Sequence, residues 1–139
     1  MRKMFLVLLL CLFSILLIGK GEAGDLKTYC ITNETASRVQ TQVATTTIIP
    51  GKDVILGFRL TPFGASCVDP FVEMHDAATT ASQTTTTGGT MFDALETDTG
   101  PLRSETAWYP KPKNLSLGLG VNLGGYSAVI IFYETLIAH

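Results

Sequence analysis

Apolar and polar residues alternate along much of the chain after residue 24, with the period of a β-strand. The clearest run has leucine or valine at every second position from 115 to 123, with small or polar residues between them. Five successive matches to a period of two favour a strand, because a helix repeats its apolar positions every three or four residues. The same alternation covers residues 53–60.

Other segments rich in Thr, Val, Ile, Phe and Tyr are punctuated by Gly and Pro, a pattern typical of sandwiches and barrels. We expect strands over residues 28–32, 38–48, 53–60, 67–76, 90–97, 106–109, 115–123 and 126–136. No segment after residue 24 has a helical period. The sequence therefore predicts an all-β protein. We expect residues 24–139 to form a single domain, an antiparallel two-sheet β-sandwich of about eight strands with a jelly-roll-like arrangement.

Local signals refine this expectation near the C-terminus. Gly124-Gly125 predicts a two-residue hairpin turn between the last two strands. Residues 126–136 are almost continuously apolar, which predicts a central strand packed on both faces. The Pro110-Lys111-Pro112 segment predicts a break after the strand at 106–109.

Residues 1–23 have a different pattern. Arg2 and Lys3 precede an uncharged apolar run over residues 4–18, and mostly small residues follow up to Gly24. A basic start, an apolar stretch of about 7–15 residues and a small-residue cleavage site are typical of a secretory signal peptide. We expect residues 1–23 to be cleaved and the protein to be secreted, to the extracellular space, the cell surface or the periplasm. The alternative is a retained membrane anchor.

Setting the signal peptide aside changes the composition. The full chain has 139 residues, is 46% hydrophobic and 16% charged, and has a formal net charge of −2. The segment before Gly24 holds three bases and one acid, which leaves 7 basic and 11 acidic residues and a net charge of −4. An acidic chain lacks the basic field of a nucleic-acid binder, and the apolar content is too high for a disordered tail.

Cys30 and Cys67 are the cysteines that remain after residue 23. An even pair in an exported chain predicts a disulfide, which would contribute roughly 3–4 kcal/mol by loop-entropy reasoning. The alternative is two free, buried thiols. There is no C-x-x-C motif, and only His75 and His139 could join the cysteines. We therefore expect no metal site.

No group of residues predicts catalysis. His75 is flanked by acidic residues, but the chain has no G-x-S-x-G motif, and the strand pattern places His75 outward in solvent. Asp69 and Glu73 would lie roughly 13 Å apart on one face of a strand, farther than the roughly 5–9.5 Å between glycosidase carboxylates. We expect neither enzymatic activity nor a cofactor.

Two segments are candidates for binding a ligand or another subunit. Seven of the fourteen residues at 77–90 are threonine, including Thr84, Thr85, Thr86 and Thr87. Such a segment predicts a surface loop, or alternatively a polar face for carbohydrate or a neighbouring subunit. Trp108 and Tyr109 form the second candidate, an exposed stacking surface, although both residue types are also ordinary core residues of a sandwich. We favour the core for this pair.

Asn33-Glu34-Thr35 and Asn114-Leu115-Ser116 match the N-glycosylation pattern. The pattern has meaning only in a eukaryotic secretory pathway.

Three segments within residues 49–134 carry a resemblance to a known family. They are His75-Asp76-Ala77 at the end of a strand, GLGVNLG at 118–124 and VIIFYE at 129–134. Together they resemble small β-sandwich proteins encoded among tailed-phage virion genes and in prophage-like regions. The resemblance implies a structural, assembly-forming role without catalytic residues. The signal peptide departs from this family, since virion proteins assemble in the cytoplasm, and it suggests a cellular surface or extracellular relative.

The sequence thus predicts an exported structural subunit of an extracellular filament, a coat or a virion-like particle. We expect its partners to be further copies or other surface or virion proteins, with residues 25–35 as a mobile arm that pairs with a neighbour's sheet edge. The alternative is a secreted module that binds a glycan or a host receptor. No nucleic-acid partner is expected, and only an uncleaved signal segment would contact a membrane.

Overall fold

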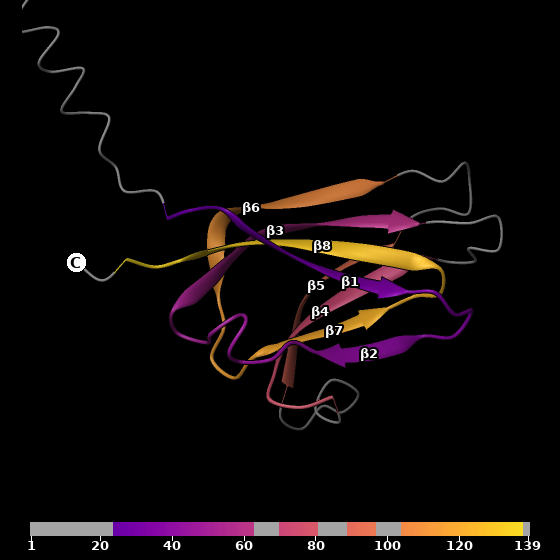
Figure 1. Ribbon diagram of the computed structural model, residues 1–139, viewed down its shortest axis with the longest axis horizontal. Helices are drawn as coiled ribbons and strands as arrows, with labels where there is room; N and C mark the ends of the chain where they lie inside the picture. Colours follow the sequence, from indigo (N-terminus) through magenta and orange to yellow (C-terminus); the bar gives the residue numbers. More distant parts are fainter. Residues whose placement is uncertain (1–23, 63–69, 81–88, 97–103, 138–139) are drawn as a thin grey trace, which may run out of the picture.

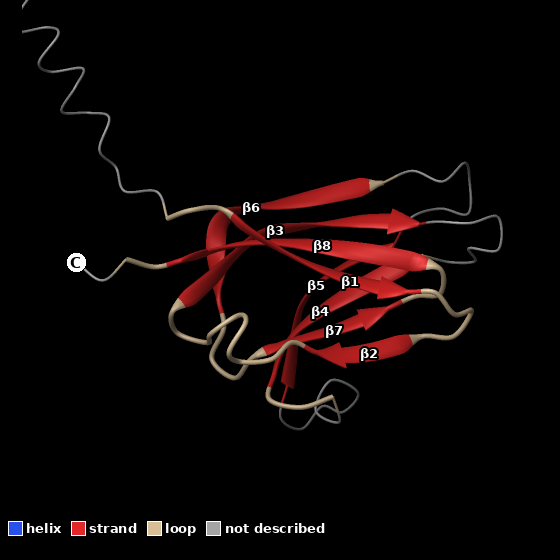
Figure 2. Cartoon of the chain, viewed as in Figure 1, coloured by secondary structure: helices blue, strands red, loops and turns tan. Residues whose placement is uncertain are grey.

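The structure of the chain, a computed structural model, describes residues 24–62, 70–80, 89–96 and 104–137. These residues form eight strands: β1 (Lys27–Asn33), β2 (Val39–Gln42), β3 (Asp53–Pro62), β4 (Phe71–Ala77), β5 (Gly89–Glu96), β6 (Glu105–Asn114), β7 (Leu119–Leu123) and β8 (Ser127–Thr135). The elements are strands joined by loops and turns (Figure 2). Within these ranges there is no helix of the length and apolarity needed to cross a membrane.

The strands form two four-stranded antiparallel sheets with the orders β1-β8-β3-β6 and β2-β7-β4-β5 (Figure 1). The chain therefore passes repeatedly from one sheet to the other, and strands at opposite ends of the sequence become neighbours. This order is that of a jelly roll, the eight-stranded sandwich built from two Greek keys. The predicted fold class is confirmed. The predicted signal peptide, residues 1–23, lies outside the described residues.

The core lies between the sheets and follows from the alternation in the sequence. Along β8, Val129, Ile131 and Tyr133 are buried, while the residues between them are half-buried on the outer face. β3 contributes Phe58 and Leu60, which are fully buried. Apolar side chains of β4 and β7 complete the same cluster from the other sheet. Each buried methylene group stabilises a fold by about 0.8 kcal/mol. The packing of this layer is therefore the main contribution to the stability of the domain.

The predicted C-terminal hairpin is wrong. β7 pairs with β2 and β4, whereas β8 pairs with β1 and β3, so Gly124-Gly125 carries the chain from one sheet to the other. A Cβ on Gly125 would lie 2.6 Å from the carbonyl oxygen of Ala36, and Tyr126 has a positive φ of 48°. Close packing against the β1–β2 connection thus requires the glycine at this corner.

Burial of the last two strands also differs from the prediction. β8 is central in its sheet but alternates between buried and half-buried residues, whereas every residue of β7 is buried. On the outer face of β7, Gly120 has no side chain to keep its neighbours away. Gln42 on β2 reaches across β7 and donates a hydrogen bond of 2.7 Å from Nε2 to the carbonyl oxygen of Ala77. Side chains of adjacent strands therefore cover β7.

Other parts of the sequence-based expectation also differ from the structure. The strand expected from residue 115 begins at Leu119, and Leu117 is 46% exposed. β6 continues through Pro110 and Pro112, because an edge strand does not need every N–H for pairing. β2 ends at Gln42, and the amides of residues 47 and 48 turn back to the carbonyl oxygen of Ala44. Residues 27–33 are not a free arm, since β1 pairs with β8 along its whole length.

Candidate functional site

The outer face of the β1-β8-β3-β6 sheet carries apolar side chains that no other layer of the described residues covers. Cys30, Ile130, Phe132 and Trp108 form what we call the apolar row. Cys30 on β1 is in register with Ile130 on β8, and Phe132 follows two residues later on the same face. Cys30 and Trp108 are exposed, whereas the two β8 residues are half-buried. Four residues on three strands of one sheet thus present apolar surface to solvent.

A glycine allows the two aromatic residues of the row to meet. Gly57 on β3 is in register with Trp108 on one side and with Phe132 on the other. The two rings are stacked above it, with centroids 4.7 Å apart and planes inclined by 26°. A Cβ on Gly57 would collide with the carbonyl oxygen of Ala107 and would lie 2.9 Å from Cε3 of Trp108. The glycine therefore fixes the position of an indole that remains 57% exposed.

Trp108 and Tyr109 do not form one surface, because neighbouring residues of a strand point to opposite faces. Tyr109 packs against the core, with its ring 6.2 Å from that of Phe58 and 6.4 Å from that of Phe92. Burial, and then the nearby Asp93 carboxylate, raise the pKa of the Tyr109 hydroxyl far above its usual range. The expectation of a core position is confirmed for Tyr109 and wrong for Trp108.

The other sheet carries a polar cluster on its outer face, made of Arg38, Glu73, His75 and Asn122. Arg38 Nη2 lies 3.1 Å from Glu73 Oε1. Asn122 Nδ2 donates to Glu73 Oε2 at 2.8 Å and lies 3.3 Å from His75 Nε2. Burial acts to raise the pKa of Glu73, but the Asn122 hydrogen bond and the charge of Arg38 outweigh it and hold the pKa below its usual value. The cluster thus holds an ionised carboxylate between three strands.

The structure corrects the predicted exposure of His75. The strand pattern predicts a solvated histidine, yet His75 is only 5% exposed although its side chain is on the outer face. Glu73, two residues away on the same face, lies 3.5 Å from its Nε2 atom. Asn122 is 2% exposed, and its Oδ1 atom has no hydrogen-bond partner among the described residues. Burial here comes from neighbouring strands, which an alternation pattern within one strand does not reveal.

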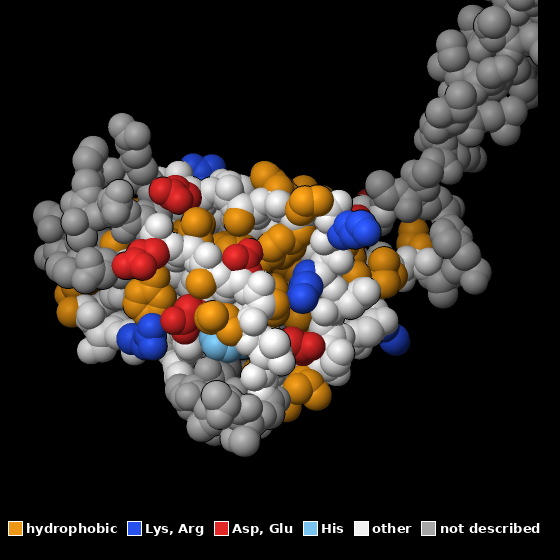
Figure 3. All heavy atoms as spheres, turned by 180° about the vertical axis from the view of Figure 1, so that it is seen from behind, with side chains coloured by type: hydrophobic (Ala, Val, Ile, Leu, Met, Phe, Trp, Pro, Cys, Tyr) orange, Lys and Arg blue, Asp and Glu red, His pale blue; other side chains and the backbone are white. Residues whose placement is uncertain are grey.

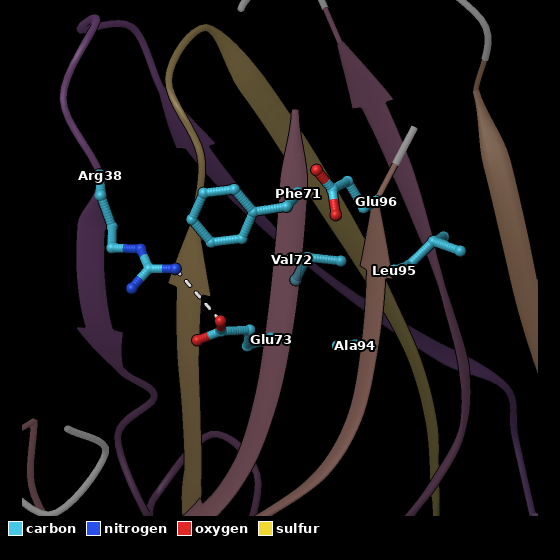
Figure 4. A pocket seen from close by; sticks show the side chains of 7 residues that line it. All are labelled: Arg38, Phe71, Val72, Glu73, Ala94, Leu95 and Glu96. Atoms are coloured by element: carbon cyan, nitrogen blue, oxygen red, sulfur yellow. Dashed lines mark hydrogen bonds and ion pairs between the residues drawn. The ribbon is translucent and has the colours of Figure 1, made fainter. Parts of the chain in front are cut away.

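A small open pocket adjoins the polar cluster. Its volume is about 210 Å³, and its lining includes Arg38, Phe71, Glu73 and Glu96. Figure 4 shows the side chain of Arg38, the residue before β2, reaching toward Glu73 on β4. The Arg38 guanidinium lies 4.3 Å from the centre of the Phe71 ring. Pockets for small molecules usually measure about 300–1,000 Å³. This pocket is smaller, and the protein's own arginine already lies over its aromatic residue.

The surrounding surface is chemically mixed. Figure 3, which views the molecule from behind relative to Figure 1, shows acidic and basic side chains scattered among apolar ones. The described residues contain no group of three or more His, Cys, Asp or Glu side chains placed to hold a metal ion.

Several predicted site residues lie outside the described part of the chain. Thr84, Thr85, Thr86 and Thr87 belong to this set, and so does Cys67. Cys30 is exposed on β1 and forms no disulfide with any described residue. The pairing of Cys30 with Cys67 therefore stays a prediction, whereas the alternative of a buried thiol is wrong for Cys30.

The two glycosylation tripeptides differ sharply in the structure. Asn33 is 3% exposed, and its Nδ2 atom donates to the carbonyl oxygens of Ser37, Leu123 and Gly124 at 2.6, 3.3 and 3.1 Å. A glycan on this nitrogen is incompatible with the fold. Asn114 is exposed at the end of β6. Only the second tripeptide is accessible in the folded domain.

Sequence reasoning missed two residues that organise these faces. Phe132 belongs to an apolar run that predicted burial on both faces, so its outward position gave no signal. Asn122 was recognised only as a small polar residue between Val121 and Leu123. The alternation of 119–123 does place Asn122 opposite the core, and the neighbours that bury it come from β2 and β4.

The fold and the apolar row define a class, a jelly-roll domain with an outer sheet face whose apolar side chains no other described residues cover. The chain matches no model of a known protein family, and the search among curated proteins also finds no match.

Proposed function

We propose that this protein is an exported structural subunit that acts by assembly, as part of an extracellular filament, a coat or a virion-like particle. The observation that carries the proposal is the apolar row on the outer face of the β1-β8-β3-β6 sheet. The signal-like residues 1–23 support export, and the resemblance of residues 49–134 to virion-type sandwiches supports a structural role. Jelly rolls also form capsid and lectin domains, so the fold alone does not choose between these functions.

Burial of the row in an assembly would give a useful free energy. An aromatic side chain can bury about 150–250 Å², so the 57% exposed indole of Trp108 offers on the order of 100 Å². At about 25 cal/mol per Å² this area contributes about 2–3 kcal/mol, or roughly 30- to 150-fold in a dissociation constant. Trp108 at the end of the row is therefore the residue expected to dominate the contact.

Sedimentation velocity over a range of protein concentrations tests the proposal. We expect the purified full chain to associate. Trp108→Ala should shift this association to protein concentrations that are roughly 30- to 150-fold higher. Met91→Ala is the matched control, because Met91 is 54% exposed but lies on β5 of the other sheet. A full chain that stays monomeric at millimolar concentration would exclude assembly through this face. Equal effects of the two substitutions would exclude the apolar row as the contact.

A second candidate function is a secreted glycan-binding module, which the exposed indole of Trp108 favours. One face of the indole stacks on Phe132, and the other part of the ring system is open for a sugar. On a glycan array, this candidate requires binding by the full chain that Trp108→Ala abolishes while the sedimentation profile stays unchanged. The assembly proposal instead requires that the full chain binds no glycan on the array and that Trp108→Ala changes the sedimentation profile.

A further inference from the structure

The edge of the β1-β8-β3-β6 sheet at β1 is open within the described residues. β1 has seven residues, contains no proline and pairs with β8 from Lys27 to Asn33 without a register shift. No described strand lies on its other side. An edge strand presents unpaired N–H and C=O groups along that side, which is a template for pairing with another strand.

We infer that two copies of this chain pair through β1 in an antiparallel, two-fold arrangement centred on Cys30. The inference rests on the proposed function, since it supplies one contact of the assembly. The middle residue of β1 is Cys30, so a two-fold axis at this point places Cys30 opposite Cys30 of the second copy. The two four-stranded sheets then join into one eight-stranded sheet by strand addition.

The side chains of β1 suit this register. Thr28 faces Thr32 of the second copy on the outer face, and cross-strand threonine pairs are favourable. On the inner face Tyr29, which packs against the core, meets the buried Ile31 of the second copy. Like charges are not brought together, since Lys27 faces the neutral Asn33 of the second copy. Self-complementarity along the whole strand is what an isologous interface requires.

A second copy is favoured over an unrelated peptide by the continuity of the outer face. Cys30 is in register with Ile130, so the pairing places the apolar rows of both copies on one face of the joined sheet. A strand from an unrelated protein would extend the backbone pairing, but it would not bring a second apolar row onto the same face of the sheet.

Site-specific disulfide cross-linking tests the register. The full chain is prepared with Cys11→Ser and Cys67→Ser, which leaves Cys30 as its one thiol, and is incubated with oxidised glutathione. Each cross-link joins two Cys30 sulfur atoms, and their two electrons and two protons pass to one oxidised glutathione, which leaves as two glutathione thiols. Directly opposed residues of antiparallel strands have Cα atoms about 4.5–5.5 Å apart, within the range that a disulfide needs. We expect a covalent dimer on non-reducing gels.

Thr28→Cys and Thr32→Cys, each combined with Cys30→Ser in the same background, are the matched controls. Both positions are exposed on the same face as Cys30. In the inferred register each new thiol is about four residues, roughly 13 Å, from its own counterpart, beyond the limit of about 7 Å. We expect each variant alone to lose the cross-link and a one-to-one mixture of the two to regain it.

The possible outcomes distinguish a failure of the β1 pairing from a failure of the proposed function. Cross-linking of Thr28→Cys alone, or failure of the mixture, overturns the register. Concentration-dependent sedimentation without a Cys30 cross-link overturns pairing through β1 and leaves assembly standing. A chain that neither cross-links nor associates overturns both.

Discussion

Asn33→Asp is the sharpest test of how the two sheets are held together at the β1–β2 corner. The substitution keeps the shape of the side chain and replaces the Nδ2 donor with an oxygen. Nδ2 now donates to three carbonyl oxygens, and the bonds to Leu123 and Gly124 are buried. Oδ1 accepts from the amide and hydroxyl of Thr35, and these bonds survive the change.

The expected cost follows from the three hydrogen bonds lost at Nδ2, each worth about 0.5–1.5 kcal/mol, and from the carboxylate oxygen that replaces Nδ2. The Gly124 carbonyl keeps a hydrogen bond of 2.7 Å from Ser127 Oγ, but a carboxylate oxygen placed against carbonyl oxygens without a donor adds repulsion. We expect the free energy of unfolding at pH 7 to fall by about 3–5 kcal/mol, a large part of the roughly 5–15 kcal/mol of a typical domain. Asn114→Asp makes the same chemical change at an exposed position and should stay within about 0.5 kcal/mol of the parent protein.

The sign of the pH dependence separates repulsion from simple loss of hydrogen bonds. The carbonyl groups raise the pKa of the new carboxyl in the folded state above its unfolded value of about 3.9. The folded variant then binds a proton more tightly, so its stability relative to the parent rises as the pH falls, by about 1.4 kcal/mol per unit between the two pKa values. Asn33→Ala lacks this dependence.

Urea unfolding followed by circular dichroism at pH 7 and pH 5 measures these differences. A pH-independent deficit for Asn33→Asp, or one no larger than that of Asn114→Asp, would refute the reasoning.

Three further predictions concern the other polar contacts. Asp76 accepts hydrogen bonds from the amides of three successive residues at 116–118, so Asp76→Ala should lower the free energy of unfolding by about 2–3 kcal/mol in urea, with Asp76→Asn recovering part of it. The pKa of Glu73 lies below its ordinary value of 4.5, so its ionised form stabilises the fold above that value and loses this effect as the pH falls. Glu73→Gln should therefore flatten the acid limb of the stability curve, and an unchanged limb would contradict the Asn122 and Arg38 contacts. Tyr109→Phe removes a buried hydroxyl that has no hydrogen-bond partner among the described residues; thermal melts should show equal or higher stability, and a loss above about 1 kcal/mol would reveal a bond there.

The strand pattern predicted the fold class because each inward position of a sandwich strand is recorded in its own sequence. Val129, Ile131 and Tyr133 are buried as their spacing requires. The Gly124-Gly125 corner was misjudged because a two-glycine turn reads the same whether it joins strands of one sheet or crosses between two. Only the partners of the flanking strands, which are distant in sequence, distinguish the two cases.

The site was less predictable than the fold because it depends on register between strands. Trp108 and Phe132 are 24 positions apart in the sequence, and they meet only because Gly57 on the intervening strand is in register with both. His75 and Asn122 approach each other in the same way across β4 and β7. No local pattern carries such information. Residue type assigned both Trp108 and Tyr109 to the core, which holds for Tyr109 and not for the 57% exposed Trp108.

The four edges of the sandwich suggest how an assembly would grow. Pro110 and Pro112 interrupt the donors of β6, and Lys111 and Lys113 add charge to that edge, which are known means of preventing strand addition. β2 has only four residues, and β5 carries a register shift against β4. β1 is regular and open within the described residues. An isologous contact through β1 joins only two chains, because each β1 edge is then paired and cannot bind a third chain. A filament or coat of the proposed kind therefore needs a second contact, and the apolar row ending at Trp108 would supply it. By this reasoning Trp108→Ala should weaken growth beyond the β1-linked dimer by roughly 30- to 150-fold in concentration, whereas loss of the β1 contact should leave association through the outer face.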